Sequence, residues 1–303
     1  MLIKYIDYFR KIFNSDEDLY GELLGILEDI VDKNKSEDIS AFLFSVEKNK
    51  VTKGNDVFSF NQRLSQDSCR KIIFIYFYVT MIYYVATLMK HKGLEMPRCI
   101  MFSGTGSKVL KIVGGMRELN NLTQIVIERI YGKEYNSYDG FSVVIEENEP
   151  KQITCRGALL QVKSETGCQA INEINRRMDD FKAPLKSNYS MISKPVLQYG
   201  DIKDHKVIEE IIEQVRQYNE FFISLCDDIR VSDRFLVDGE AWNTFKENVN
   251  RDLEHHFIQG WNFVNKDQAM LNDSDPVPDA LFFYPIIGSI RNNLIDNIKE
   301  KDL

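Results

Sequence analysis

The sequence predicts an α/β fold in its first half, followed by a mainly helical C-terminal extension. Three observations support this division. An uncharged run of 18 residues, 72–89, predicts a long buried helix. A short apolar run, 99–102, predicts a strand that leads directly into a glycine-rich segment. After residue 200 the apolar residues recur at helical spacing. For 303 residues, two structural units are expected, and we divide the chain into residues 1–163 and 164–303.

Composition and charge limit the class of protein. The hydrophobic fraction of 44% and the charged fraction of 28% are typical of a globular chain with enough apolar residues for a core. The net charge of −8 disfavours a nucleic-acid partner, because binding to a phosphate backbone depends on lysine and arginine. Five cysteines without a C-x-x-C pair or a secretory signal predict reduced thiols and a cytoplasmic location.

The elements before the long helix are predicted from local patterns. Residues 2–33 predict two helices, and Ser15 provides the N-cap of the second. The polar, turn-rich stretch 48–56 precedes a short apolar run at 57–60. A helix then spans about 66–92 and ends at a C-cap glycine, Gly93.

The uncharged run inside that helix is open to a second interpretation. Its length from Ile72 to Met89 lies at the lower limit for crossing a bilayer. Four tyrosines and two threonines within the run weaken insertion at the bilayer centre. We favour a buried helix of a soluble domain, and a membrane helix is the alternative.

The next elements alternate between strands and helices. A strand is predicted at 99–102, a helical segment from Val109, a stop at Gly114 and Gly115, an amphipathic helix at 119–130, a strand at 141–145 and a short helix beginning at Pro150. Beyond residue 200, three apolar stripes at helical spacing occupy 208–225, 242–264 and 287–298.

The segment from Ser103 to Lys108 is the main candidate for a ligand-binding site. A strand that stops at a glycine turn and continues as a helix is suited to phosphate or nucleotide binding. Gly104 and Gly106 let a ligand approach the backbone, Ser107 is placed to cap the helix, and Lys108 offers a positive charge. The spacing matches neither a P-loop nor a Rossmann fingerprint. A tight strand-to-helix turn without a ligand is the alternative.

The context of this segment resembles the end of the ATPase domain shared by actin, sugar kinases and heat-shock chaperones. The matching stretches are PRCIMFSGTGSK at 97–108 and PKQITCRGAL at 150–159, separated by a helix and a strand. In that superfamily a strand and glycine turn, the adenosine motif, holds the sugar and base of the nucleotide. A later glycine-containing helix packs at the hinge, and Gly157 matches its glycine. The resemblance implies a partial actin-like (ribonuclease H-like) lobe whose nucleotide contacts are Gly104, Thr105, Gly106, Ser107 and Lys108.

The chain departs from that superfamily in a way that affects its expected function. The Asp-x-Gly hairpins that bind phosphate and support the metal are missing, since Asp139-Gly140 and Asp238-Gly239 are isolated and out of order. We therefore name no catalytic residue and no metal ligand. We expect Mg²⁺ to bind only where an N-terminal half completes the fold.

These observations lead to three hypotheses about function. The first is binding of ATP by the C-terminal portion of an actin-like or chaperone-like ATPase that needs a missing N-terminal half or another protein partner. The second is a non-enzymatic interaction protein built on a decayed ATPase half, whose helices after residue 200 engage a partner. The third is a membrane-anchored protein that uses residues 72–89.

The histidines and cysteines that could bind a metal or react are interpreted as structural residues. His255 and His256 are adjacent, so on a helix they point in different directions and do not form an i, i+4 metal pair. His205 is interpreted as an isolated surface residue. Cys99 and Cys155 lie in apolar strings and are expected to be inert core thiols.

Overall fold

The computed structural model describes four main segments of the chain. These are residues 65–132, 141–145, 204–265 and 281–300, with Gly25, Asp29, Gly200 and the short pairs 52–53 and 56–57 in addition. The two pairs form β1 (Thr52–Lys53) and β2 (Asp56–Val57), which are antiparallel. The short helix expected from Pro150, Gly157, Cys155 and the boundary near residue 163 lie outside the described residues.

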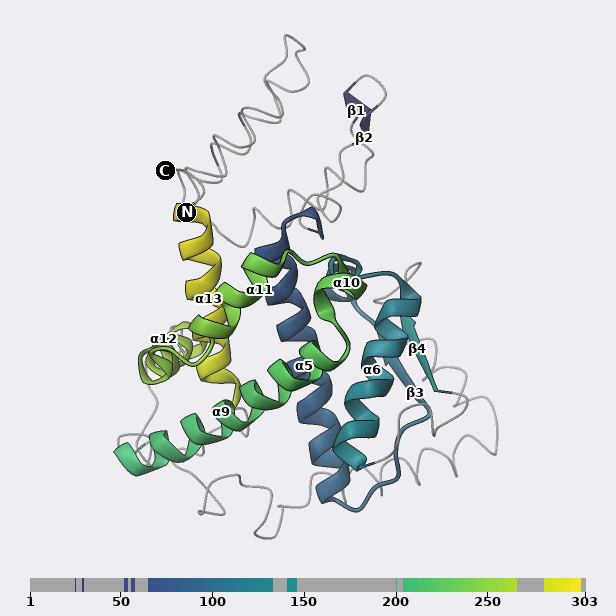
Figure 1. The fold of residues 1–303 in the computed structure, drawn as a ribbon. Coiled ribbons are helices and arrows are strands. Elements are labelled where there is room, and N and C mark those ends of the chain that lie inside the picture. The colour runs from purple at the N-terminus through teal and green to yellow at the C-terminus, as the bar shows by residue number, and fades with distance from the viewer. Residues whose placement is uncertain are drawn as a thin grey trace.

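Helix α5 (Ser68–His91) occupies the centre of the fold. Figure 1 shows α6 (Met116–Tyr131) and two strands on one side of it, and α12 (Leu253–Asn265) and α13 (Phe283–Glu300) on the other. The Asp67 side chain caps the helix by accepting a hydrogen bond from the Arg70 amide at 3.1 Å. At the other end Gly93 has a φ of 68°, as a left-handed residue following a helix requires. The sequence-based bounds of this helix are therefore confirmed.

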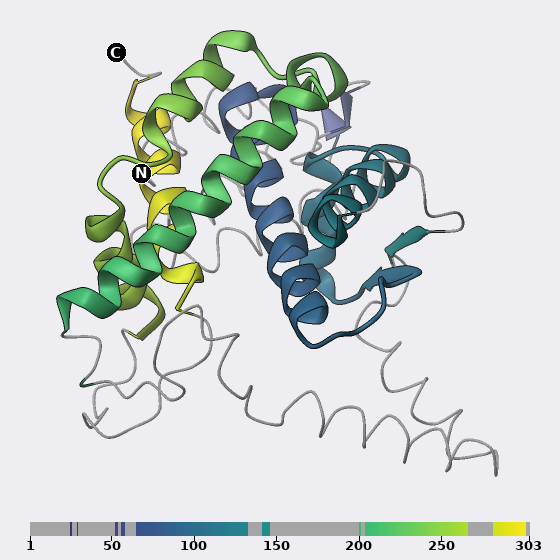
Figure 2. The same ribbon diagram turned by 60° about the horizontal axis from the view of Figure 1, so that its bottom comes forward.

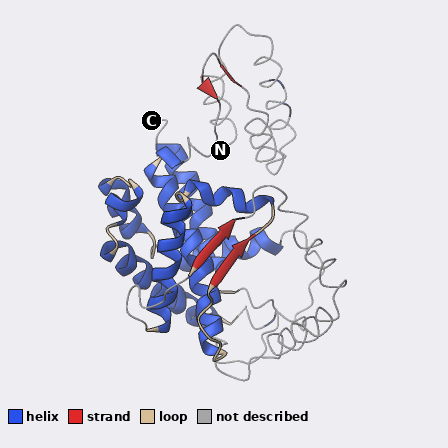
Figure 3. Ribbon diagram, turned by 90° about the vertical axis from the view of Figure 1, so that its right-hand side faces the viewer, coloured by secondary structure: helices blue, strands red, loops and turns tan. Residues whose placement is uncertain are grey.

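A small parallel sheet lies beside α5. Strand β3 (Cys99–Phe102) is followed by the 3₁₀ helix η1 (Thr105–Ile112), helix α6 (Met116–Tyr131) and strand β4 (Ser142–Ile145). The two strands pair in parallel from Cys99 opposite Ser142 to Phe102 opposite Ile145, and Figure 3 shows them side by side. The amide of Val143 donates to Asn120 Oδ1 at 2.7 Å, and this hydrogen bond links β4 to α6. The α/β class is thus confirmed at this level, although helices greatly outweigh strands.

Five helices make up the described part of the C-terminal region. They are α9 (His205–Asp228), α10 (Val231–Phe235), α11 (Gly239–Asn248), α12 (Leu253–Asn265) and α13 (Phe283–Glu300). Figure 2 shows α9 crossing α5 obliquely. The sequence predicted 242–264 as one stripe, but the structure divides it into α11 and α12. The reason is local, because Asp252 has a φ of 53°, which no α-helix accommodates.

One hydrophobic core joins the two sides of α5. The largest cluster contains residues of α5 and α6, the strand residue Val143, and residues of α9, α11 and α13. Aromatic rings fill its centre, where Tyr76 packs edge-on against Phe222 and Phe245 with ring centroids 5.1 and 5.3 Å apart. The helices after residue 200 therefore pack onto the same core as the strands.

A buried network of polar side chains runs through this core. The Tyr76 hydroxyl donates to Asn219 Oδ1 at 2.7 Å, and Thr80 Oγ1 lies 2.7 Å from the Tyr218 hydroxyl. On the other side of α5, the Tyr78 hydroxyl bonds to Thr123 of α6. Every one of these bonds links α5 to another helix, so they fix its rotation as well as its position.

Helix α5 is also apolar and long enough to meet the criterion for a membrane span. Of its most apolar 18-residue window, 56% is buried inside the protein. The tyrosines and threonines expected to weaken insertion include those that bond to α6 and α9. These contacts favour the interpretation of α5 as a core helix.

Buried tyrosines make the fold sensitive to alkaline pH. Burial raises the pKa of Tyr78 to about 12 and raises the pKa of Tyr76 and Tyr218 above the ordinary value of 10.0. Because the folded pKa exceeds the unfolded one, this stability is complete below pH 10 and is lost as the pH rises toward 12 and beyond. Each such tyrosine contributes a slope of about 1.4 kcal/mol per pH unit.

We therefore expect the thermal midpoint to fall steeply between about pH 10 and 12. Tyr78→Phe is the control, because it removes one ionisable group and should make the fall shallower. A midpoint that stays constant from about pH 9 to 12 would contradict the burial of these tyrosines.

Candidate functional site

The predicted glycine loop begins where β3 ends. Gly104 has φ 91° and ψ 159°, a combination available essentially to glycine alone. The Ser107 hydroxyl and the Ser107 amide both donate to the Gly104 carbonyl, at 2.8 and 3.1 Å. These two hydrogen bonds close the turn at the start of η1. The expected Ser107 cap is therefore not formed: Gly104 occupies the N-cap position of η1 without a side-chain hydrogen bond, and the buried Ser107 hydroxyl instead donates to the carbonyl of the turn.

The other predicted contacts lie in the first turns of η1. The backbone of Thr105, Gly106 and Lys108 belongs to that helix, while their side chains lie outside the described part of the structure. The helical segment expected from Val109 thus begins earlier and is a 3₁₀ helix. The first N–H groups of a helix lack acceptors within it, and they carry the positive end of its dipole.

The loop lies at the carboxyl edge of the parallel sheet. Parallel pairing brings the ends of β3 and β4 to the same edge, since Phe102 is opposite Ile145. In open α/β sheets, ligands bind in the crevice outside the carboxyl ends of the strands. The topology therefore places the glycine loop just beyond the carboxyl ends of the two paired strands.

Charge is divided unevenly between the two sides of the protein. Residues 68–131 include nine lysines and arginines and three acidic residues. Residues 204–265 include six lysines and arginines and thirteen acidic residues. Lys111 and Arg117, which follow the glycine loop, are both exposed. Residues 68–131 are thus basic although the whole chain carries −8, and these two exposed cations follow the loop closely in the sequence.

The sheet has one open face in the described structure. Met101 and Val144 are opposite one another in the register and are 55% and 38% exposed. Cys99 lies on the same face and is exposed, so the prediction of an inert core thiol at this position is wrong. The physical reason is that α5 and α6 cover only the other face of β3 and β4.

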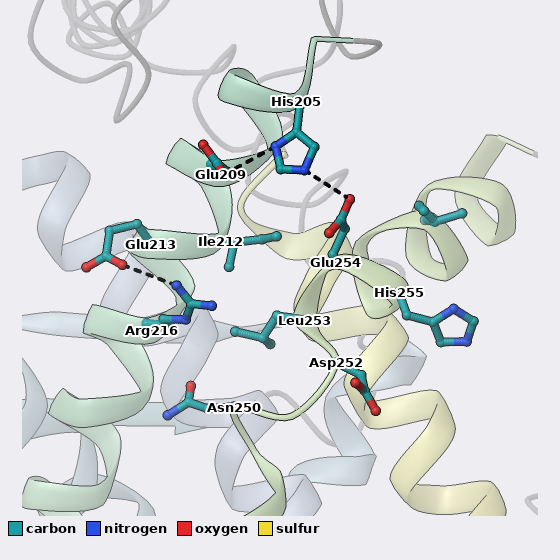
Figure 4. Close-up of a pocket in the computed structure, with 11 residues that line it drawn as sticks. His205, Glu209, Ile212, Glu213, Arg216, Asn250, Asp252, Leu253, Glu254 and His255 are labelled. Atoms are coloured by element: carbon teal, nitrogen blue, oxygen red, sulfur yellow. Dashed lines mark ion pairs between the residues drawn. The ribbon is translucent and has the colours of Figure 1, made fainter.

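A second candidate site is a groove between α9 and the start of α12. It has a volume of about 710 Å³ and lies on the far side of α5 from the sheet. In Figure 4 the His205 ring lies between two carboxylates, with Nδ1 3.3 Å from Glu209 Oε1 and Nε2 3.8 Å from Glu254 Oε1. The interpretation of His205 as an isolated surface residue was therefore incomplete. The i, i+4 spacing of His205 and Glu209 was the available signal, but Glu254 is brought there by the fold.

The described residues offer no evident metal centre. Across the segments that the structure describes, no group of three or more histidine, cysteine, aspartate or glutamate side chains is arranged to hold a metal ion. The adjacent His255 and His256 differ as expected, since His255 is exposed and His256 is buried.

Comparisons with known proteins give no further guidance. No family model, no curated protein and no solved structure matches the chain.

Proposed function

We propose that this chain binds the adenosine part of ATP through the glycine loop 104–108, as the C-terminal portion of an actin-like ATPase. The observation that carries the proposal is the conformation of Gly104 at the carboxyl end of β3, within a parallel strand–helix–strand unit. That geometry leaves the backbone accessible to a flat ligand, and the free N–H groups at the start of η1, with the exposed Lys111 and Arg117 that follow in the sequence, suit an attached phosphate chain.

The proposal limits this chain to holding the nucleotide. The acidic hairpins that would support Mg²⁺ and orient the attacking water have no counterpart in the sequence. Hydrolysis would need an N-terminal half, either as part of a longer chain or as a separate polypeptide. The open face of β3 and β4 supports such a partner, because parallel sheets are normally covered on both faces. The three free cysteines among the described residues are consistent with a cytoplasmic location.

Ligand-observed NMR on the full chain tests the proposal. We expect saturation transfer to ATP and to adenosine with similar, weak affinities, because the contacts to the base and sugar are present and the phosphate-binding hairpins are not. Addition of Mg²⁺ should change neither affinity. Absence of transfer to both ligands would refute nucleotide binding by this chain.

Gly104→Ala is expected to lower the affinity for adenosine and ATP about tenfold. The new Cβ meets no atom within 4 Å, so the effect comes from the backbone, which must leave the conformation that only glycine adopts. Gly132→Ala is the matched control, since Gly132 also has a positive φ, 69°, and open space around it but lies at the far end of α6. Both variants should lose some stability, but only Gly104→Ala should lose affinity. Equal affinities for the two variants would remove the loop from the site.

A further inference from the structure

The groove between α9 and α12 combines an apolar floor with a charged rim. The floor consists of Ile212 and Leu253, which are buried, and Ile258, which is 46% exposed. Side chains from two elements about forty positions apart in the sequence form the walls. The groove is open to solvent, and its exposed apolar surface comes mainly from Ile258, which suits a ligand with a small apolar part.

The rim selects the charge of that ligand. Its carboxylates are Glu209, Glu213, Asp252 and Glu254, and its arginine, Arg216, lies 3.6 Å from Glu213. The formal charge of the rim is therefore negative. The wider region has the same sign, with thirteen acidic residues against six basic ones in 204–265. An anionic ligand such as a nucleotide or a nucleic acid is disfavoured here.

The histidine between two carboxylates shows how a cation would fit. The His205 ring lies 3.3 Å from Glu209 Oε1 but 3.8 Å from Glu254 Oε1, so it does not reach both carboxylates at hydrogen-bond distance. A guanidinium group has five N–H donors in a planar fork and can serve two carboxylates together. Both carboxylates are exposed, so an incoming arginine can reach them.

We propose that this groove binds a basic segment of a partner protein, with an arginine side chain that displaces the exposed His205 ring and contacts Glu209 and Glu254, and with an apolar neighbour against Ile258. Charge complementarity and the apolar floor together identify the occupant as a peptide, because a simple cation would gain nothing from contact with apolar side chains. This interaction is separate from the proposed nucleotide site, which lies across α5, and each proposal can fail without the other.

The test uses a fluorescein-labelled octapeptide that contains two arginines and two leucines, and the full-length chain. Fluorescence anisotropy at low salt should show saturable binding that weakens as salt is added. A second peptide with citrulline in place of arginine keeps the shape and removes the charge, and it should not bind. Absence of binding by the arginine peptide, or equal binding by both peptides, would overturn the proposal.

A pair of double variants separates specific binding from general attraction. Glu209→Gln with Glu254→Gln neutralises the two groove carboxylates and should weaken peptide binding about fivefold or more. Glu220→Gln with Glu247→Gln changes the net charge equally at exposed positions outside the groove and should change the affinity less than about twofold. Equal weakening by the two double variants would show that the affinity depends only on the net charge of the protein, and it would refute the groove as the site. Thermal unfolding checks that all variants fold as the parent does.

Discussion

Replacing Gly288 by alanine is expected to destabilise the protein by about 3 kcal/mol or more, because it forces two closely packed helices apart. A Cβ at Gly288 would overlap the backbone carbonyl group of His256 on the facing helix. The contact is reciprocal, because a Cβ at Gly260 of α12 would overlap the carbonyl of Tyr284 on α13. Two glycines thus allow the backbones of α12 and α13 to touch, and a side chain at either position must separate them.

Chemical unfolding of Gly288→Ala measures this effect, with Gly239→Ala as the matched control. Gly239 begins α11, and a Cβ there meets no atom within 4 Å. The control should change the free energy of unfolding by no more than about 0.5 kcal/mol. Similar unfolding midpoints for the two variants would contradict the close packing of α12 on α13. Since α12 carries Leu253 and Glu254, Gly288→Ala should also weaken peptide binding in the groove.

The second large effect is expected at Asn219 of α9, which is fully buried and bonds to α5 and to the residues that follow α11. Its Oδ1 accepts from the Tyr76 hydroxyl at 2.7 Å. Its Nδ2 donates to Asn250 Oδ1 at 2.8 Å and to the Val249 carbonyl at 3.3 Å. Asn219→Ala leaves the buried Tyr76 hydroxyl and the Val249 carbonyl without this partner and creates a void, so we expect a loss of about 3 kcal/mol in the free energy of unfolding.

A double-mutant cycle with Tyr76→Phe isolates the bond between the two side chains. In the double variant neither partner is left with an unmet hydrogen bond to the other, so its destabilisation should be smaller than the sum of the single effects by about 1 kcal/mol or more. Asn243→Ala, at an exposed position of α11, is the control and should be nearly neutral. Strictly additive effects would mean that Tyr76 and Asn219 do not interact, and they would weaken the assignment of α5 to the protein core.

Elements with local signals were predicted well. Helix α5 was found within two residues at each end because its apolar run and the glycine that ends it, Gly93, are adjacent in the sequence. Strand β3 and the glycine turn at Gly104 were found for the same reason, and the structure confirms the positive φ that the turn needs. Helix α6 matched because an amphipathic period is a property of a single segment.

Features that depend on distant residues could not be predicted. The break between α11 and α12 falls at Asp252, an acidic residue in a conformation that the sequence pattern does not reveal. Cys99 was misjudged because exposure of a strand face depends on what packs against it. His205 was recognised as a surface residue, but its contact with Glu254 spans 49 positions and exists only in the folded chain.

Local sequence patterns are enough to predict the apolar central helix and the strand with its glycine turn. The uneven division of charge between residues 68–131 and 204–265 is also visible in the sequence. Only the folded structure shows that β3 and β4 pair in parallel, which places Gly104 at the carboxyl edge of the sheet, and that α9 and α12 enclose a groove. The physical reason is that caps, turns and periodicity act over a few neighbouring residues, whereas sheet pairing and helix packing join residues far apart in the chain.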